Sequence, residues 1–166
     1  MLPFAIAFDR DASAPDAGRA LLRRLAAEQL GVAPEDVPLT QRCPDCGGPH
    51  GRPEIADSEL RVSLARCALG AVAVAAWGAD IGVDVEPSAQ TPARLAAIEE
   101  VAGGTGVARW TRVEAVLKAD GRGLRIDPRR VRIEGDIATI AGEPARYRIV
   151  EPFVDTPLQV SVAFAL

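Results

Sequence analysis

Cysteine is scarce in this sequence. The 166 residues include three cysteines, and an odd, small number is unlike the framework of a disulfide-stabilised secreted domain. The N-terminal stretch MLPFAIAFDRD lacks the basic region of a signal peptide and turns acidic at Asp9. From these two features we expect a cytoplasmic protein.

An excess of positive charge is also missing. The chain has 19 lysines and arginines against 23 aspartates and glutamates, which gives a formal net charge of −4. We therefore expect no general affinity for nucleic acid or for an anionic membrane. Local groups of arginines can still bind phosphate. The composition, 48% hydrophobic and 25% charged, is that of a globular protein large enough for one core or two small packed halves.

The chain has no uninterrupted apolar run of membrane length. The stretch LGAVAVAAWGADIGVDV, residues 69–85, comes nearest, but Gly78, Asp80 and Asp84 interrupt it. It is better explained by two buried strands, Ala71–Trp77 and Ile81–Glu86, joined by a tight turn as a hairpin.

The remaining patterns predict helices and strands in a mixed order. We expect a strand at Phe4–Phe8, a helix at Pro15–Leu30, a loop at Pro34–Pro53, a strand at Leu60–Leu64, helices at Pro92–Val101 and Trp110–Ala119, and strands at Arg130–Glu134, Ile137–Ile140, Arg146–Glu151 and Leu158–Ala165. This order favours an α+β fold over a doubly wound parallel sheet.

The strand IGVDVE places two carboxylates on one face. Because alternate residues of a strand point the same way, Asp84 and Glu86 share a face with Gly82. Two neighbouring carboxylates repel each other, and a divalent cation such as Mg²⁺ would relieve the repulsion. Taken alone, the stretch is better explained by a strand with one solvated face.

The stretch WTRVEAVLKADGRGL begins as a helix and ends on glycines. Glu114 and Lys118 are four residues apart and project from one face, while Val113, Val116 and Leu117 are available for the core. A surface ion pair at this spacing contributes about 0.3–0.5 kcal/mol. The alternative is that both residues belong to an active site.

The stretch CPDCGGPHGRP, residues 43–53, allows two interpretations. Cys43, Cys46 and His50, joined by the distant Cys67, have the composition of a Cys₃His zinc site. The second tight ligand pair of most zinc ribbons is missing, so we expect thiols without metal. In the other interpretation, backbone amides with His50 and Arg52 cradle phosphate. Basic residues of the first helix, among them Arg19 and Arg23, form either a solvated face or a further phosphate contact.

Three of these stretches together resemble a known family. GVDVE followed by W-T-x-x-E-A-x-x-K-x-x-G-x-G-L resembles the signature pair of the 4′-phosphopantetheinyl transferases, in particular the surfactin-type branch. CGGPHGRP is similar to that branch's upstream CGxxHGKP element. The resemblance implies an α+β fold in which two similar α/β halves, residues 1–80 and 81–166, surround the active site about a pseudo-twofold axis. The halves form one structural unit, and a monomer is expected.

The function implied by the resemblance is a magnesium-dependent transfer. The family moves the 4′-phosphopantetheine arm of coenzyme A onto a serine of an apo acyl- or peptidyl-carrier protein and releases adenosine 3′,5′-bisphosphate. Asp84, Glu86 and Glu114 match the metal positions, Glu114 matches the candidate base, and Lys118 matches the lysine at the reacting phosphate. The residues expected to bind coenzyme A are Arg19, Arg23, His50, Gly51, Arg52, Pro53, Arg66 and Lys118.

The sequence departs from the family pattern in several places. The segment 87–109 is short where carrier-protein contacts are expected, and Val113 stands where a lysine commonly precedes the glutamate. In RVSLAR, Ala65 and Arg66 replace the serine and histidine of an Asn-x-Ser-His element, and Arg52 replaces a lysine. These changes bear on carrier contact and rate more than on coenzyme A binding.

Other classes of function stay open. They are a catalytically weak module that binds coenzyme A or a carrier protein, a zinc-stabilised interaction protein, and another magnesium-dependent phosphoryl or nucleotidyl enzyme. The sequence does not identify the carrier protein or its pathway.

Overall fold

A computed structural model describes residues 4–154 and 157–166. It combines α-helices with antiparallel sheets, which confirms the expected α+β class. Residues 1–3 of the stretch interpreted as lacking a signal peptide lie outside the described part. No helix among the described residues has the length and apolar character needed to cross a membrane.

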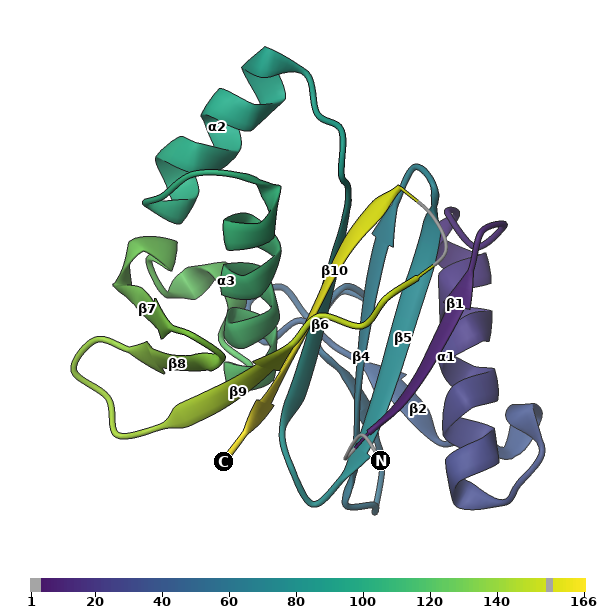
Figure 1. Ribbon diagram of the computed structural model, residues 1–166. Coiled ribbons are helices and arrows are strands. Elements are labelled where there is room, and N and C mark those ends of the chain that lie inside the picture. The colour runs from purple at the N-terminus through teal and green to yellow at the C-terminus, as the bar shows by residue number, and fades with distance from the viewer. Residues whose placement is uncertain (1–3, 155–156) are drawn as a thin grey trace.

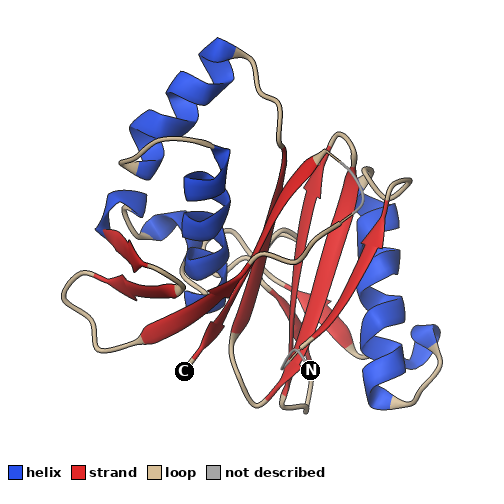
Figure 2. Cartoon of the chain, viewed as in Figure 1, coloured by secondary structure: helices blue, strands red, loops and turns tan. Residues whose placement is uncertain are grey.

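Two consecutive parts of the chain form the fold (Figures 1 and 2). The first unit contains β1 (Ala5–Asp9), α1 (Pro15–Leu30), the 3₁₀ turn η1 (Pro34–Asp36), β2 (Leu39–Gln41), β3 (Pro53–Ile55), β4 (Leu60–Cys67) and β5 (Gly70–Trp77). The second unit contains β6 (Ile81–Pro87), α2 (Pro92–Ala102), α3 (Val107–Asp120), η2 (Gly123–Arg125), η3 (Pro128–Arg130), β7 (Val131–Glu134), β8 (Ile137–Ile140), β9 (Arg146–Val150) and β10 (Leu158–Ala165).

Both units use the same strand order. The larger sheet of the first unit runs β1-β5-β4, and that of the second runs β6-β10-β9-β8-β7. In each, the last strand pairs antiparallel with the strand that precedes the long helix. The chain therefore repeats a β-α-β-β arrangement, and β7 and β8 extend the second copy.

The predicted hairpin of residues 71–86 is wrong. β5 pairs with β1 and β4, whereas β6 pairs with β10, so the turn after β5 carries the chain from one sheet to the other. β5 is buried nearly throughout, and its pattern gave no sign of which strand would pair with it. The predicted loop at Pro34–Pro53 is also wrong in part, because it contains η1 and β2.

The units stack as four layers, with α1 and α3 outside and the two sheets between them (Figure 1). Leu21, Leu22 and Leu25 of α1 pack against the first sheet. On the other side, α3 packs against the second sheet through the predicted core residues Val113, Val116 and Leu117, all fully buried. A third apolar core lies between the sheets and contains Val72, Val74, Val83, Val160 and Val162. This shared core joins both units into one body.

Local signals account for the helix boundaries. α1 begins on Pro15 and ends before Gly31, whose φ of 70° suits a glycine cap, and both predicted ends are confirmed. α2 begins after Thr91, whose hydroxyl accepts a hydrogen bond from the backbone N–H of Arg94 at 3.2 Å. α3 begins at Val107, three residues before the predicted start.

Candidate active site

The site begins where α3 approaches β6 most closely, at Gly82. A Cβ atom at this position would lie 2.2 Å from the carbonyl oxygen of Ala115 and 2.4 Å from the backbone nitrogen of Ala119. Only glycine permits this approach. It brings the Glu114–Lys118 face of the helix onto the strand face that carries Asp84.

Lys118 and Asp84 form a partly buried ion pair. The ammonium donates to Asp84 Oδ1 at 2.7 Å and to the carbonyl oxygen of Val83 at 3.0 Å. Asp84 is 8% exposed, so the solvated-face explanation of IGVDVE does not hold for this residue. Its neighbours Ile81 and Val83 lie in the core between the sheets, which confirms the predicted alternation.

Burial governs the protonation of the acids. Desolvation raises the pKa of Asp84, and the positive charge and hydrogen bond of Lys118 oppose that shift. Desolvation also raises the pKa of Glu114, and the nearby charges of Asp84 and Glu86 raise it further, against Lys118. Glu114 thus interacts electrostatically with Asp84 and Glu86, the two other predicted metal ligands. Buried acids with raised pKa values are typical of functional sites.

Glu86 lies at the outer end of the cluster. Its Oε1 accepts from Arg94 Nη2 of α2 at 2.9 Å, and its Oε2 lies 3.4 Å from Gln90 Nε2. The short segment between β6 and α3 therefore places a cation over this carboxylate. The resemblance did not point to Arg94 or Gln90.

The three acids have the ligand atoms that a hard cation prefers, but they are spaced too widely to bind one ion together as they stand. Asp84, Glu86 and Glu114 offer carboxylate oxygens, the ligands that Mg²⁺ prefers, and Mg²⁺ commonly keeps several waters as well. In the part of the chain that the structure describes, these three do not gather within 4.8 Å of one another. Lys118 forms an ion pair with Asp84, and Arg94 forms one with Glu86.

A cavity of about 680 Å³ lies beside this cluster, between the two units. The segment 41–53, β4 and the end of α3 line it. Its cationic side chains are Arg52, Arg66, Lys118, Arg122 and Arg125, and Asp45 is the one acid among the lining residues described. Such a cavity favours a ligand with several negative charges, and arginine suits phosphate because it can donate two parallel hydrogen bonds.

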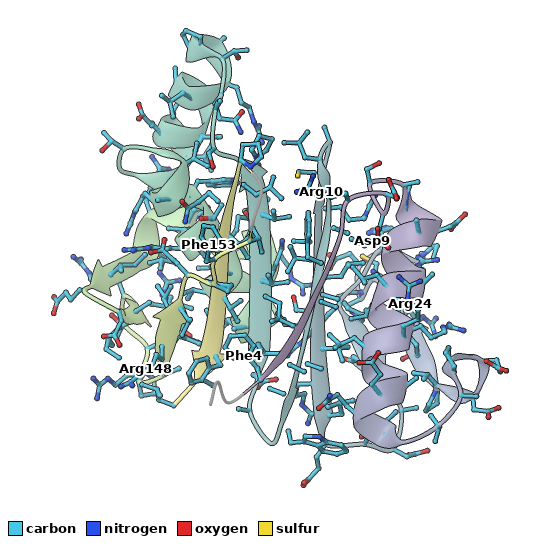
Figure 3. All side chains as sticks on the ribbon, turned by 45° about the vertical axis from the view of Figure 1, so that its right-hand side comes forward. Phe4, Asp9, Arg10, Arg24, Arg148 and Phe153 are labelled. Carbon is cyan, nitrogen blue, oxygen red and sulfur yellow. The ribbon has the colours of Figure 1, made fainter. Side chains whose placement is uncertain are left out.

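Most of the predicted coenzyme A residues line this cavity, namely His50, Gly51, Arg52, Pro53, Arg66 and Lys118. Arg19 and Arg23 are not among the described lining residues. Arg19 instead donates to Gln41 Oε1 at 3.0 Å and to the carbonyl oxygen of Pro49 at 2.5 Å, so it braces the cavity loop from α1. Arg24 pairs with Asp9 at the end of β1, at 3.1 Å (Figure 3).

Arg66 and Arg52 both line the cavity, but different contacts hold their side chains. Arg66 lies over Gly18 of α1, where an added Cβ would come within 2.5 Å of Arg66 Cδ, and it donates to the carbonyl oxygen of Ser13 at 3.2 Å. Arg52 pairs with Asp80 at 2.6 Å, in the turn between the two sheets. Arg52 therefore has a carboxylate partner, whereas Arg66 donates to a neutral backbone oxygen.

Three charged residues of the cavity were not predicted from the sequence: Arg122, Arg125 and Asp45. Arg122 pairs with Asp120 and Glu143, and Arg125 pairs with Asp45 at 3.4 Å. The run GRGLR after the helix was a usable signal, since it puts arginines beside glycines at a helix end. The contact of Arg125 with Asp45 spans 80 residues and had no local signal.

The Cys/His loop forms a second group of metal-ligand side chains. The ligand atoms of Cys43, Cys46 and His50 all lie within 4.8 Å of one another, and Cys46 Sγ is 2.9 Å from His50 Nε2. Cys67, at the end of β4, is not part of this group, so the four-ligand Cys₃His arrangement is wrong. Hydrogen bonds from the backbone N–H groups of Cys46 and Asp45 lower the pKa of Cys43, whereas burial raises the pKa of Cys67.

Comparison with known proteins adds no family to this description. No protein-family model matches the chain, and no curated protein matches it. The assignment of a function therefore rests on the three motifs and on the geometry around Lys118.

Proposed function

We propose that the protein transfers the 4′-phosphopantetheine arm of coenzyme A to a serine of an apo acyl- or peptidyl-carrier protein. Mg²⁺ is the cofactor and adenosine 3′,5′-bisphosphate is the second product. The observation that carries this proposal is the position of Lys118. It contacts the buried acid Asp84 and also lines the basic cavity.

The charge of the cavity supports coenzyme A as the donor substrate. Coenzyme A carries a pyrophosphate and a 3′-phosphate, so it needs cations at more than one place. Arg52 and Arg66 lie on the wall formed by the first unit, and Lys118 lies on the wall formed by the second. Arg66 is the better candidate for the 3′-phosphate, because its guanidinium donates to the neutral backbone oxygen of Ser13, whereas Arg52 pairs with a carboxylate.

The acids support a magnesium-dependent reaction. Asp84, Glu86 and Glu114 would hold the ion. Bound Mg²⁺ would supply positive charge to the pyrophosphate as negative charge develops on the leaving oxygen. Binding alone would not require buried carboxylates, whose desolvation is unfavourable.

The protein's own groups can move the proton and position the phosphate. The carrier serine oxygen forms a bond to phosphorus, and the bond from phosphorus to the leaving nucleotide oxygen breaks with its electron pair. Glu114 accepts the serine proton, directly or through a water. The ammonium group of Lys118 places a positive charge beside the transferred phosphate.

The repeated β-α-β-β arrangement supports the family fold with two related halves around a pseudo-twofold axis. The strand order β1-β5-β4 corresponds to β6-β10-β9, and the cavity lies at the junction of the two units. We expect residues 1–80 and 81–166 to act as one unit and the protein to act as a monomer, because the core between the sheets is shared.

The test is transfer itself. The purified protein is incubated with coenzyme A, Mg²⁺ and apo carrier proteins from fatty-acid, polyketide and nonribosomal peptide pathways, and intact-mass spectrometry follows each carrier. We expect one phosphopantetheine arm on at least one carrier, no gain without Mg²⁺, and no gain on a carrier whose acceptor serine is replaced by alanine. If coenzyme A binds by calorimetry but no carrier gains mass, the protein is a binding module and the transferase proposal fails.

A further inference from the structure

The loop of residues 43–50 is folded back on itself by its own backbone. Cys43 N donates to the carbonyl oxygen of Gly48 at 2.8 Å, and Gly47 N donates to the carbonyl oxygen of Cys43 at 2.8 Å. Gly47 has a φ of 73°, which permits this tight reversal. The closed turn brings Cys43 and Cys46 together.

A backbone N–H group is directed at the Cys46 sulfur. Gly48 N donates to Cys46 Sγ at 3.4 Å. Hydrogen bonds of this kind orient ligands in protein metal sites. The other sulfur, Cys43 Sγ, lies 3.9 Å from Asp45 Oδ2.

The spacing of the ligand atoms suits a tetrahedral ion. Zn–S bonds of about 2.3 Å and Zn–N bonds of about 2.0–2.1 Å place ligand atoms roughly 3.5–3.8 Å apart. The three ligand atoms here lie within 4.8 Å of one another, and the contact of Cys46 with His50, at 2.9 Å, needs to open by less than about 1 Å. A small side-chain adjustment is enough.

We propose that Cys43, Cys46 and His50 bind one Zn²⁺, with a water molecule as the fourth ligand. Sulfur and imidazole ligands select zinc, whereas Mg²⁺ prefers the oxygen ligands of the acidic site. Binding converts two thiols to thiolates and releases their two protons, while His50 binds as the neutral ring. The carboxylate of Asp45 lies near Cys43 but pairs with Arg125.

The ion would fix one wall of the basic cavity. Cys43 and His50 line the cavity, and His50 directly precedes Gly51 and Arg52. Arg19 holds the same loop through the carbonyl oxygen of Pro49. Zinc would therefore hold the phosphate-facing residues in place without contacting the acidic cluster. This role does not depend on transfer activity.

The experiment measures metal directly. Protein purified without added metal or chelator is analysed for zinc by mass spectrometry, alongside Cys43→Ser, His50→Ala and the matched control Cys67→Ser. We expect about one zinc per chain in the wild type and in Cys67→Ser, and at least a tenfold loss in the other two variants. Equal zinc in all four proteins, or none in the wild type after incubation with zinc, overturns the proposal.

Cobalt substitution and thiol counting separate zinc from a redox role for the CxxC pair. Co²⁺-loaded wild type and Cys67→Ser should show thiolate-to-cobalt absorption that His50→Ala weakens and Cys43→Ser reduces further. Free thiols are counted after removal of the metal. A Cys43–Cys46 disulfide in freshly purified protein, with no zinc uptake after reduction, would replace the metal site by a redox pair. Circular dichroism shows whether each variant is folded. For any folded ligand variant, the cobalt spectrum shows whether the replaced residue binds the metal.

Discussion

The two units share a strand order but differ in what lies between the long helix and its neighbouring strand. In the first unit, β1 turns Ala5 and Ala7 toward α1, and both join an apolar core. In the second unit, β6 turns Gly82 and Asp84 toward α3, where Asp84 meets Lys118. The buried part of the interface is therefore apolar in one copy, where the ion pair of Arg24 with Asp9 lies at its partly exposed end, and charged in the other.

This difference separates what the fold needs from what the site needs. The first unit shows that a buried interface without buried acids, with the partly exposed ion pair of Arg24 and Asp9 at its end, is enough to hold a helix on this sheet. Burying Asp84 and Glu114 adds a desolvation cost that raises the pKa of both. A costly group that the scaffold does not require is best explained by function.

The two interfaces nevertheless resemble each other in one detail. Each pairs a glycine with a long cationic side chain, but the roles of helix and strand are exchanged. In the first unit Gly18 lies on the helix and Arg66 on the strand, whereas in the second Gly82 lies on the strand and Lys118 on the helix. Both cations reach the same cavity. Four predictions test this comparison.

The largest effect should come from removing the acids of the second unit. Asp84→Ala and Glu114→Gln should each lower the rate of carrier modification by about two orders of magnitude or more, because they remove a metal ligand and the base. Initial rates by intact-mass spectrometry measure this loss. The matched control is Asp9→Asn, which changes the acid at the end of β1 in the first unit and should leave the rate within about twofold. A Glu114→Gln protein with near-normal turnover would exclude Glu114 as the base.

The two glycines should respond differently to alanine. In Gly82→Ala the new methyl group meets backbone atoms of α3, so we expect a loss of about 1–3 kcal/mol in the free energy of unfolding. In Gly18→Ala it meets Cδ and Cγ of the flexible Arg66 side chain, which can shift, and alanine favours the helix by up to about 1 kcal/mol. Urea unfolding compares the two. Equal losses would show that the two interfaces are equally tight.

Local patterns were sufficient for much of this structure. The span of α1 follows from its apolar stripe, Pro15 and Gly31, and the alternation of β6 follows from IGVDVE. The partner strand of β5 could not be predicted, because its apolar residues fit either neighbour. The contact of Arg19 with Pro49 and that of Arg125 with Asp45 join distant segments, and no local pattern signals either one.

The site residues could be predicted from the sequence for a different reason. Asp84, Glu114 and Lys118 were predicted through their motifs, and the structure brings them together although 30 residues separate the first two. The separation of Cys67 from Cys43 and Cys46 depends on where β4 ends relative to the loop, which the spacing of cysteines does not reveal.

A smaller effect is expected for the cation of the first unit. Arg66→Ala should weaken coenzyme A by about tenfold or more relative to dephospho-coenzyme A, which lacks the 3′-phosphate, since a charged hydrogen bond contributes roughly 1.5–3 kcal/mol. Calorimetry with both ligands gives the ratio, and Arg61→Ala on the same strand is the matched control. Equal weakening of both ligands would contradict the 3′-phosphate role and favour Arg52.

The smallest effect concerns the stability of the charged interface itself. Burial raises the pKa of Glu114, so the folded protein binds its proton more tightly than the unfolded chain does. Its contribution to stability is therefore most favourable below the unfolded pKa of about 4.3 and declines as the pH rises through the raised folded value. Glu114→Gln removes this decline, and at pH 7 without added magnesium the variant should be at least as stable as the wild type. The advantage should shrink toward pH 4, and Glu134→Gln on the exposed end of β7 is the matched control. Urea unfolding across this pH range makes the comparison, and a Glu114→Gln protein that is less stable at pH 7 would mean that the carboxylate stabilises the fold.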